Sequence, residues 1–114
     1  MRSKVNDSAR LTLIFESISN IEKFVEGTDS YELFEQNKIL CHAVVYNLQC
    51  IGECVYKLSP EFIASHKEFN WDVVKGLRHV LVHDYYSVNM KTIWNIVEKD
   101  LPMFKSYLSS ITNN

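Results

Sequence analysis

Apolar residues recur along the chain every three to four positions, the spacing that gathers them on one face of an α-helix. The first such stretch begins after a cap at Asn6 or Asp7 and stops before Gly27. Its inward positions are Leu11, Ile14, Phe15, Ile18, Ile21 and Val25. The pattern therefore predicts a first helix over this stretch.

A second apolar pattern contains no helix breaker except Gly52 and predicts one long helix over residues 30–57. At ~1.5 Å per residue this helix would be about 40 Å long. Asp29 stands three residues before Glu32 and predicts a variant of the capping box at its start. The inward positions are Leu33, Ile39, Leu40, Val44, Leu48, Ile51, Val55 and Leu58.

The next segment predicts two further helices. Ser59 is a cap and Pro60 suits the first helical position, which predicts a short helix that ends near His66. Asn70 is a second cap, and the helix that follows runs to about His83.

The last helix is expected over residues 87–111, with Pro102 inside it. The proline should kink this helix, because its ring conflicts with the carbonyl of Glu98. No repeat or low-complexity segment interrupts the chain. We expect an all-α fold, a single domain over residues 1–114 built as an up-and-down bundle of four main helices plus one short helix.

Composition agrees with this fold class and adds a hint about assembly. The chain has 114 residues, of which 46% are hydrophobic, with only 3 glycines and 2 prolines, too few for a turn-rich sandwich or barrel. So short a chain buries a smaller fraction of its surface than a large one does. A homodimer would be a natural supplement.

Charge is close to balanced overall but uneven along the chain. The formal net charge of −2 excludes a globally basic nucleic-acid binder. Residues 16–35 carry six acidic residues against Lys23 alone, so the remaining chain has more basic than acidic residues. A locally basic face therefore stays possible.

The N-terminal residues and the cysteines bear on the compartment. The stretch "MRSKVNDSARLTLIF" lacks a long apolar core, and no apolar run approaches ~18 residues, so neither secretion nor membrane spanning is expected. Cys41, Cys50 and Cys54 are odd in number and form no CxxC motif. Reduced thiols and a cytoplasmic location are expected.

The stretch "GLRHVLVHDYY", residues 76–86, concentrates the chemistry of the chain. On a helix at ~100° per residue, Arg78 falls among apolar positions, which it shares with Trp71, Val74, Leu77, Leu81 and Val82. A guanidinium cannot deprotonate there, so it needs an anion, a buried carboxylate or an exit to a cleft.

The two histidines of the stretch fall on a different face. His83 lies roughly 140° round the helix from Arg78, on a stripe with Asp72, Gly76 and His79. The small Gly76 would let a ligand or a partner backbone approach. Arg78 and His83 converge on one substrate only if the helix end unwinds or a second copy of the chain contributes.

Two interpretations of this constellation stay open from the residues alone. One is RNA cleavage without metal, in which histidines near their free pKa of ~6.5 transfer protons and arginine holds the phosphate. The other is a polar helix end with a salt-bridged arginine. A metal trio of His79, His83 and Asp84 is disfavoured, because Asp84 points ~100° away from His83 on a regular helix.

Several segments of the chain resemble proteins of the HEPN domain family. "RHVLVHDY" fits the family signature Rx4HxY, with Arg78, His83 and Tyr85 at the specified positions. "NLQCIGECVYKLS" is similar to the "IGEA" segment of the family's long helix, and "WDVVKGLRHVLVHDY" and "TIWNIVEKDLP" resemble two further segments. The match covers about residues 31–105 and looks closest to HepT-like toxins. Cys54 stands where alanine is usual, which should affect helix packing rather than catalysis.

The resemblance implies an all-α homodimer with a composite, metal-independent endoribonuclease site at its interface. Arg78 and His83 would be catalytic, and His79 would support them. Apart from the resemblance, Glu53 follows Gly52 on the long helix and is either an exposed charge or an interface residue that faces Arg78. The resemblance also implies an RNA substrate, no cofactor, and an MntA-like nucleotidyltransferase antitoxin that transfers AMP to Tyr85. Tyr86 is adjacent, but Tyr85 fits the signature. The alternative is a non-catalytic HEPN interaction module that partners a nucleotidyltransferase.

Overall fold

A computed structural model describes residues 3–83 and 89–112, and it describes the side chains from residue 6 on except those of residues 79–83. All regular structure in these residues is helical, as predicted. The elements are α1 (Ser3–Phe24), α2 (Tyr31–Gln36), α3 (Lys38–Tyr56), α4 (Pro60–Ser65), α5 (Trp71–His83), α6 (Met90–Asn95), a π-helical turn η2 (Ile96–Asp100) and α7 (Leu101–Thr112).

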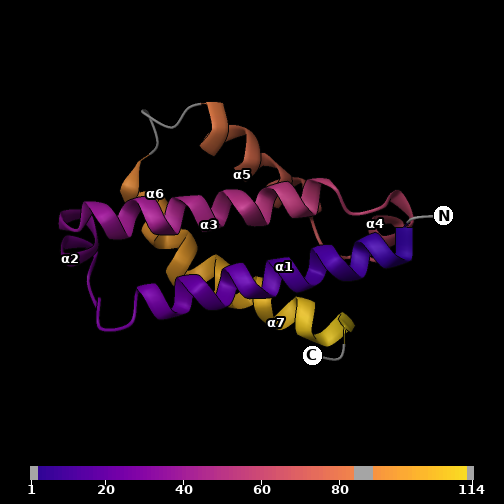
Figure 1. The fold of residues 1–114 in the computed structure, drawn as a ribbon, viewed down its shortest axis with the longest axis horizontal. Coiled ribbons are helices and arrows are strands. Elements are labelled where there is room, and N and C mark those ends of the chain that lie inside the picture. Colours follow the sequence, from indigo (N-terminus) through magenta and orange to yellow (C-terminus); the bar gives the residue numbers. More distant parts are fainter. Residues whose placement is uncertain (1–2, 84–88, 113–114) are drawn as a thin grey trace.

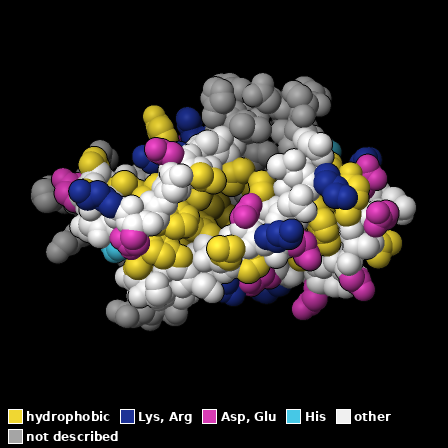
Figure 2. All heavy atoms as spheres, turned by 180° about the vertical axis from the view of Figure 1, so that it is seen from behind, with side chains coloured by type: hydrophobic (Ala, Val, Ile, Leu, Met, Phe, Trp, Pro, Cys, Tyr) yellow, Lys and Arg dark blue, Asp and Glu magenta, His cyan; other side chains and the backbone are white. Residues whose placement is uncertain are grey.

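The central element is α3, which contacts α1 along one side and α5 along another. Figure 1 shows α1 and α3 side by side and antiparallel, with α7 behind them and the short α4 near the N-terminal end of α1. Seen from the opposite side, hydrophobic side chains line a hollow in the middle of the molecule, with charged side chains around it (Figure 2).

The core combines the inward positions of these helices. Side chains that are almost wholly buried come from α1, α2, α3, α6 and α7: Ile14, Ile18, Ile21, Phe34, Val44, Leu48, Ile51, Val55, Ile93 and Leu108. Trp71 and Trp94 are 4% and 7% exposed. The Trp94 ring lies 5.2 Å from that of Phe34, and the Trp71 Nε1–H donates to the His66 carbonyl at 2.9 Å. Both tryptophans are therefore core residues.

The prediction of one continuous helix over residues 30–57 is wrong at Asn37. This residue has an extended backbone, with φ −95° and ψ 91°, and its side-chain oxygen accepts the Leu40 N–H at 3.0 Å. Asparagine competes for backbone groups in this way and so favours caps over helix interiors. The predicted cap of the preceding helix is also one residue off, because Ser30 and not Asp29 accepts the Leu33 N–H.

The predicted cap at Asn6 or Asp7 is wrong as well. The α1 helix already begins at Ser3, and Asp7 is a buried residue within it. Its carboxylate accepts the backbone N–H of Ser59 at 2.8 Å and the Ser59 hydroxyl at 2.6 Å. Ser59 does cap α4 as predicted, since its hydroxyl oxygen accepts the Phe62 N–H at 3.1 Å. These two hydrogen bonds of Asp7 therefore connect α1 to the start of α4.

The last predicted helix is divided, and the disturbance expected at Pro102 appears just before it. The Leu101 N–H donates to the Ile96 carbonyl five residues back, which is the hydrogen bond of a π-helix. A proline has no N–H to continue the regular α-helical pattern, and Pro102 is the second residue of the α-helix that follows.

The α3 helix is the most apolar element. By length and composition alone it could cross a bilayer, contrary to the expectation from the sequence. A core helix of a soluble protein meets the same criteria, and 56% of this apolar window is buried inside the fold. Passing that test is therefore weak evidence for a membrane span.

The three cysteines are free thiols, in agreement with the sequence prediction. Cys41 and Cys54 are buried, and burial is the main cause that raises the pKa of each thiol. The Cys41 thiol donates to the Phe34 carbonyl at 3.2 Å. Both are packing residues of the α3 core face.

Candidate functional site

Arg78 lies where α5 touches α3 most closely. A Cβ atom placed on Gly52 of α3 would come within 2.8 Å of the Arg78 backbone nitrogen and 3.1 Å of its Cβ. Glycine at this position thus allows the two helix backbones to meet. Gly76 is exposed, and nothing within this chain lies within 4 Å of a Cβ placed there, so the approach of a ligand or a partner backbone at Gly76 stays a prediction.

Two side chains of α3 hold the guanidinium of Arg78. Its Nε–H donates to Oε1 of Glu53, and the same atoms form an ion pair. Its Cζ lies 4.3 Å from the centroid of the Tyr56 ring, a cation–π distance. Glu53 and Tyr56 are three residues apart and so lie on one helix face. Glu53 thus faces Arg78 within one chain, its predicted role at an interface stays a prediction, and Tyr56 is a further contact of the guanidinium that was not predicted.

This arrangement leaves part of Arg78 available to a ligand. The side chains of Arg78 and Glu53 are 33% and 39% exposed. Among the residues that the structure describes, the recorded hydrogen bond of the guanidinium uses Nε, and no acceptor is bound to its two terminal nitrogens. A guanidinium fixed at Nε and stacked on one face can still present its terminal N–H groups to a phosphate.

The backbone of His79 and His83 belongs to α5, which stays helical through His83. Positions 78 and 83 are therefore ~140° apart around the helix axis. The side chains of both histidines lie outside the described residues, as do Asp84, Tyr85 and Tyr86. Of the predicted site residues, the structure brings together Arg78 and Glu53 and gives the helical position of His79 and His83.

The contact with Tyr56 has a signal in the sequence. A helical wheel of α3 places Tyr56 one turn after Glu53, on the outward side. The close approach of the α5 backbone to Gly52 has no such signal, because hydrophobic periodicity does not indicate which glycine contacts another helix backbone. No cluster of three or more possible metal ligands occurs within the described part of the chain.

Fold and site define a small all-α protein with an arginine held at the contact of two helices and a histidine further along the same helix. Comparison with known proteins identifies the family to which this protein belongs. A family described as "Ribonuclease HepT-like" matches residues 14–111, so the chain belongs to the HepT-like family of the HEPN superfamily.

Named relatives agree with this assignment. The chain is 32% identical to "Putative RNase MJ1380" of Methanocaldococcus jannaschii, over 90% of this chain and 94% of that protein. It is 32% identical to "Probable ribonuclease HepT" of Thermococcus cleftensis, over 81% and 83% of the two chains. It is 34% identical to "Putative RNase TTE0752" of Caldanaerobacter subterraneus subsp. tengcongensis, over 72% and 73%. No solved structure was found to match the chain. Family membership supports a ribonuclease function.

Proposed function

We propose that this chain is an endoribonuclease that cleaves RNA without a metal ion, with Arg78 and His83 as catalytic residues. The observation that carries the proposal is the placement of Arg78. Glu53 and Tyr56 orient its guanidinium, no described residue accepts a hydrogen bond from its terminal nitrogens, and the same helix continues to His83.

The chemistry uses these groups in ordinary roles. A neutral histidine accepts the proton of a ribose 2′-hydroxyl, whose oxygen attacks the adjacent phosphorus. His79, the supporting histidine, gives its proton to the departing 5′-oxygen when it is protonated. The products are a 2′,3′-cyclic phosphate and a 5′-hydroxyl, so no water is consumed in this step. Arg78 stabilises the negative charge that builds up on the phosphate oxygens, and His79 supports the pair.

A second copy of the chain supplies the missing half of the site. Within one chain a regular α5 turns positions 78 and 83 away from each other. Large apolar side chains of α3, Ile39, Tyr46 and Tyr56, are 85%, 64% and 54% exposed and share the outward side of the helix with Glu53. An exposed apolar stripe beside the site supports a homodimer whose interface joins Arg78 of one chain to His83 of the other.

Incubation of the purified protein with RNA in EDTA tests the proposal. The parent should cleave, and Arg78→Ala and His83→Ala should each reduce the rate by a factor of 10² or more. His66→Gln is a matched control, because His66 belongs to α4 and its ring nitrogen contacts the Phe62 carbonyl instead. No cleavage by the parent, or equal cleavage by His83→Ala, would contradict the proposal.

The proposed biological setting is a toxin–antitoxin pair. A small nucleotidyltransferase antitoxin, similar to MntA, transfers AMP from ATP to the hydroxyl oxygen of Tyr85, two residues after His83, and releases pyrophosphate. The bulky anion blocks phosphate entry and so stops cleavage. Incubation with such a partner and ATP should raise the intact mass by one adenylyl group, and Tyr85→Phe should abolish the increase whereas Tyr86→Phe should not.

One observation favours a second function, a non-catalytic interaction module. Arg78 is already paired with Glu53 and stacked on Tyr56, which is also what a purely structural arginine requires. In that case the protein forms a tight complex with the nucleotidyltransferase but has no ribonuclease activity by itself. The RNA assay in EDTA separates the two functions.

A further inference from the structure

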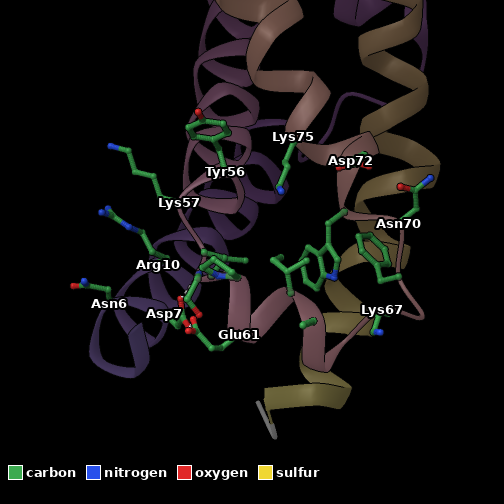
Figure 3. Close-up of a pocket in the computed structure, with 17 residues that line it drawn as sticks. Asn6, Asp7, Arg10, Tyr56, Lys57, Glu61, Lys67, Asn70, Asp72 and Lys75 are labelled. Atoms are coloured by element: carbon green, nitrogen blue, oxygen red, sulfur yellow. Dashed lines mark hydrogen bonds between the residues drawn. The ribbon is translucent and has the colours of Figure 1, made fainter. Parts of the chain in front are cut away.

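A groove runs across the end of the molecule where α1, α3, α4 and α5 meet. Its volume is about 1270 Å³, and its walls come from the first turns of α1, the end of α3, α4 and the start of α5. Figure 3 shows Tyr56 at one end of this groove and Glu61 at the other. Sites for small molecules usually enclose ~300–1,000 Å³, so the space suits a piece of a polymer.

Four basic residues line this groove: Arg10, Lys57, Lys67 and Lys75. Arg10, Lys57 and Lys75 come from α1, the end of α3 and α5, and Lys67 follows α4. Arg10 and Lys57 lie on one side and Lys75 on the other (Figure 3). Burial is the main effect on the Cys54 thiol and raises its pKa, but Arg10 and Lys57 both lower it, so both charges lie near Cys54.

Arg10, Lys57 and Lys75 form no recorded ion pair within the described part of the chain. The ion pairs recorded there join Arg78 to Glu53 and Lys105 to Glu22, and neither includes a base of the groove. The Arg10 Nε is buried and has no hydrogen-bond partner among the described residues. A buried donor without an acceptor is costly. Because this atom has almost no accessible surface, a ligand can reach Arg10 only at the other nitrogens of its guanidinium.

Three acidic residues also line the groove: Asp7, Glu61 and Asp72. Asp7 is already bound by Ser59, and Glu61 lies at the end away from Tyr56. Asp72 lies across the groove from Arg10 and Lys57 (Figure 3). The side nearest Tyr56 therefore favours anions.

The groove is continuous with the candidate active site. Tyr56 lines the groove and also stacks under the guanidinium of Arg78. Lys75 precedes Arg78 by three residues on α5, so the two side chains are neighbours on one helix face. A chain of phosphates that reaches Arg78 can thus continue past Tyr56 into the groove.

We propose that this groove binds the single-stranded RNA that flanks the cleaved phosphate, with Arg10, Lys57 and Lys75 contacting its phosphates and Tyr56 stacking on a base. The proposal rests on the ribonuclease function proposed above. Charge on a groove and an exposed aromatic ring are the features that bind single strands without reading their sequence. The groove therefore adds affinity and a preference for longer substrates.

Binding is measured in the His83→Ala background, so that the RNA stays intact. The probe is a fluorescent single-stranded RNA of about 20 nucleotides, followed by anisotropy at several salt concentrations. The triple variant Arg10→Gln, Lys57→Gln, Lys75→Gln should bind at least about tenfold more weakly, and its salt slope should be smaller by about 2, since each phosphate contact contributes ~0.7. Asp72→Asn should bind more tightly.

A matched control has the same change in charge elsewhere. Lys23, Lys99 and Lys105 do not line the groove, and their triple exchange to Gln should weaken binding only slightly. Equal binding by the two triple variants would overturn the proposal. Circular dichroism establishes that both are folded, and the single variant Lys75→Gln gives the same test with one exchange.

The cleavage assay separates this inference from the proposed function. In the active background, the groove variant should lose about tenfold more kcat/KM on the long RNA than on a dinucleotide. If the parent cleaves RNA but the loss does not depend on length, the groove proposal fails and the ribonuclease function stands. If the parent does not cleave RNA, the proposed ribonuclease function is wrong, and the binding measurements still test whether the groove binds RNA. The groove proposal is also wrong if the groove variant binds RNA as the parent does but no longer binds an acidic protein that the parent binds.

Discussion

Gly52 determines how closely α3 and α5 approach at the candidate site. The atom that a Cβ would meet there is the backbone nitrogen of Arg78, which cannot turn aside as a flexible side-chain end can. The same contact brings Glu53, the next residue, against the guanidinium. Stability and site geometry are therefore coupled at this one position.

Gly52→Ala should lower the free energy of unfolding by about 1–3 kcal/mol, because the helices must separate to admit the methyl group. Gly76→Ala is the matched control on α5, where the added carbon meets nothing within 4 Å. Alanine is the better helix former, so that exchange should stabilise by roughly 0.5–1 kcal/mol. Urea denaturation of the two variants measures both values. Changes of the same sign would contradict this account of Gly52.

Glu53 acts on the reaction through Arg78 and is a positioning residue. The pair is more than a third exposed on the glutamate side, so its direct contribution to stability is small, on the order of 0–1 kcal/mol. Glu53→Gln should therefore leave thermal unfolding almost unchanged and still reduce kcat about tenfold, with little effect on KM. A loss of stability that matches the loss of activity would indicate a structural role instead.

At the scale of elements, hydrophobic periodicity predicts most helices but not their interruptions. The run from Leu33 to Leu58 continues in helical register across residue 37, so the pattern shows no break there. The break depends on the side chain of Asn37, which binds the Leu40 N–H, and asparagine also occurs on exposed helix faces. Asp7 fits a helix cap by residue type, whereas its actual partner, Ser59, is 52 residues away, and no local pattern shows that pairing.

Asn37→Ala tests the boundary between α2 and α3 by the sign of its effect. If residue 37 were inside a continuous helix, alanine would stabilise the protein. As a cap, Asn37 holds the Leu40 N–H, and its loss should cost about 1 kcal/mol. Asn37→Asp keeps an acceptor oxygen and should remain close to the parent. Chemical denaturation distinguishes the two outcomes, and stabilisation by alanine would refute the cap.

At the scale of the whole molecule, the uneven charge along the sequence predicts only part of what the surface shows. An excess of bases outside residues 16–35 predicts that a basic face can exist. Its place depends on tertiary contacts that join α1, the end of α3 and the start of α5, and no local pattern contains them. The wheel of α5 did predict the divergence of positions 78 and 83, because that depends only on regular helix geometry.

This divergence leads to a prediction about assembly. If each active site takes Arg78 from one chain and His83 from the other, Arg78→Ala and His83→Ala chains should complement each other in a mixed dimer. One of the two sites then contains both intact residues, and random mixing makes half of the dimers mixed. RNA cleavage should return to roughly a quarter of the parental rate.

The measurement mixes the two inactive variants under conditions that allow subunits to exchange, and then follows RNA cleavage in EDTA. Each variant alone, at the same total concentration, is the control. A site complete within one chain predicts no recovery, because every chain in the mixture lacks one of its two groups. Ile39→Glu or Tyr46→Glu, on the exposed stripe of α3, should lower both the dimer fraction by light scattering and the recovered activity. Recovery that survives complete loss of the dimer would contradict the shared site.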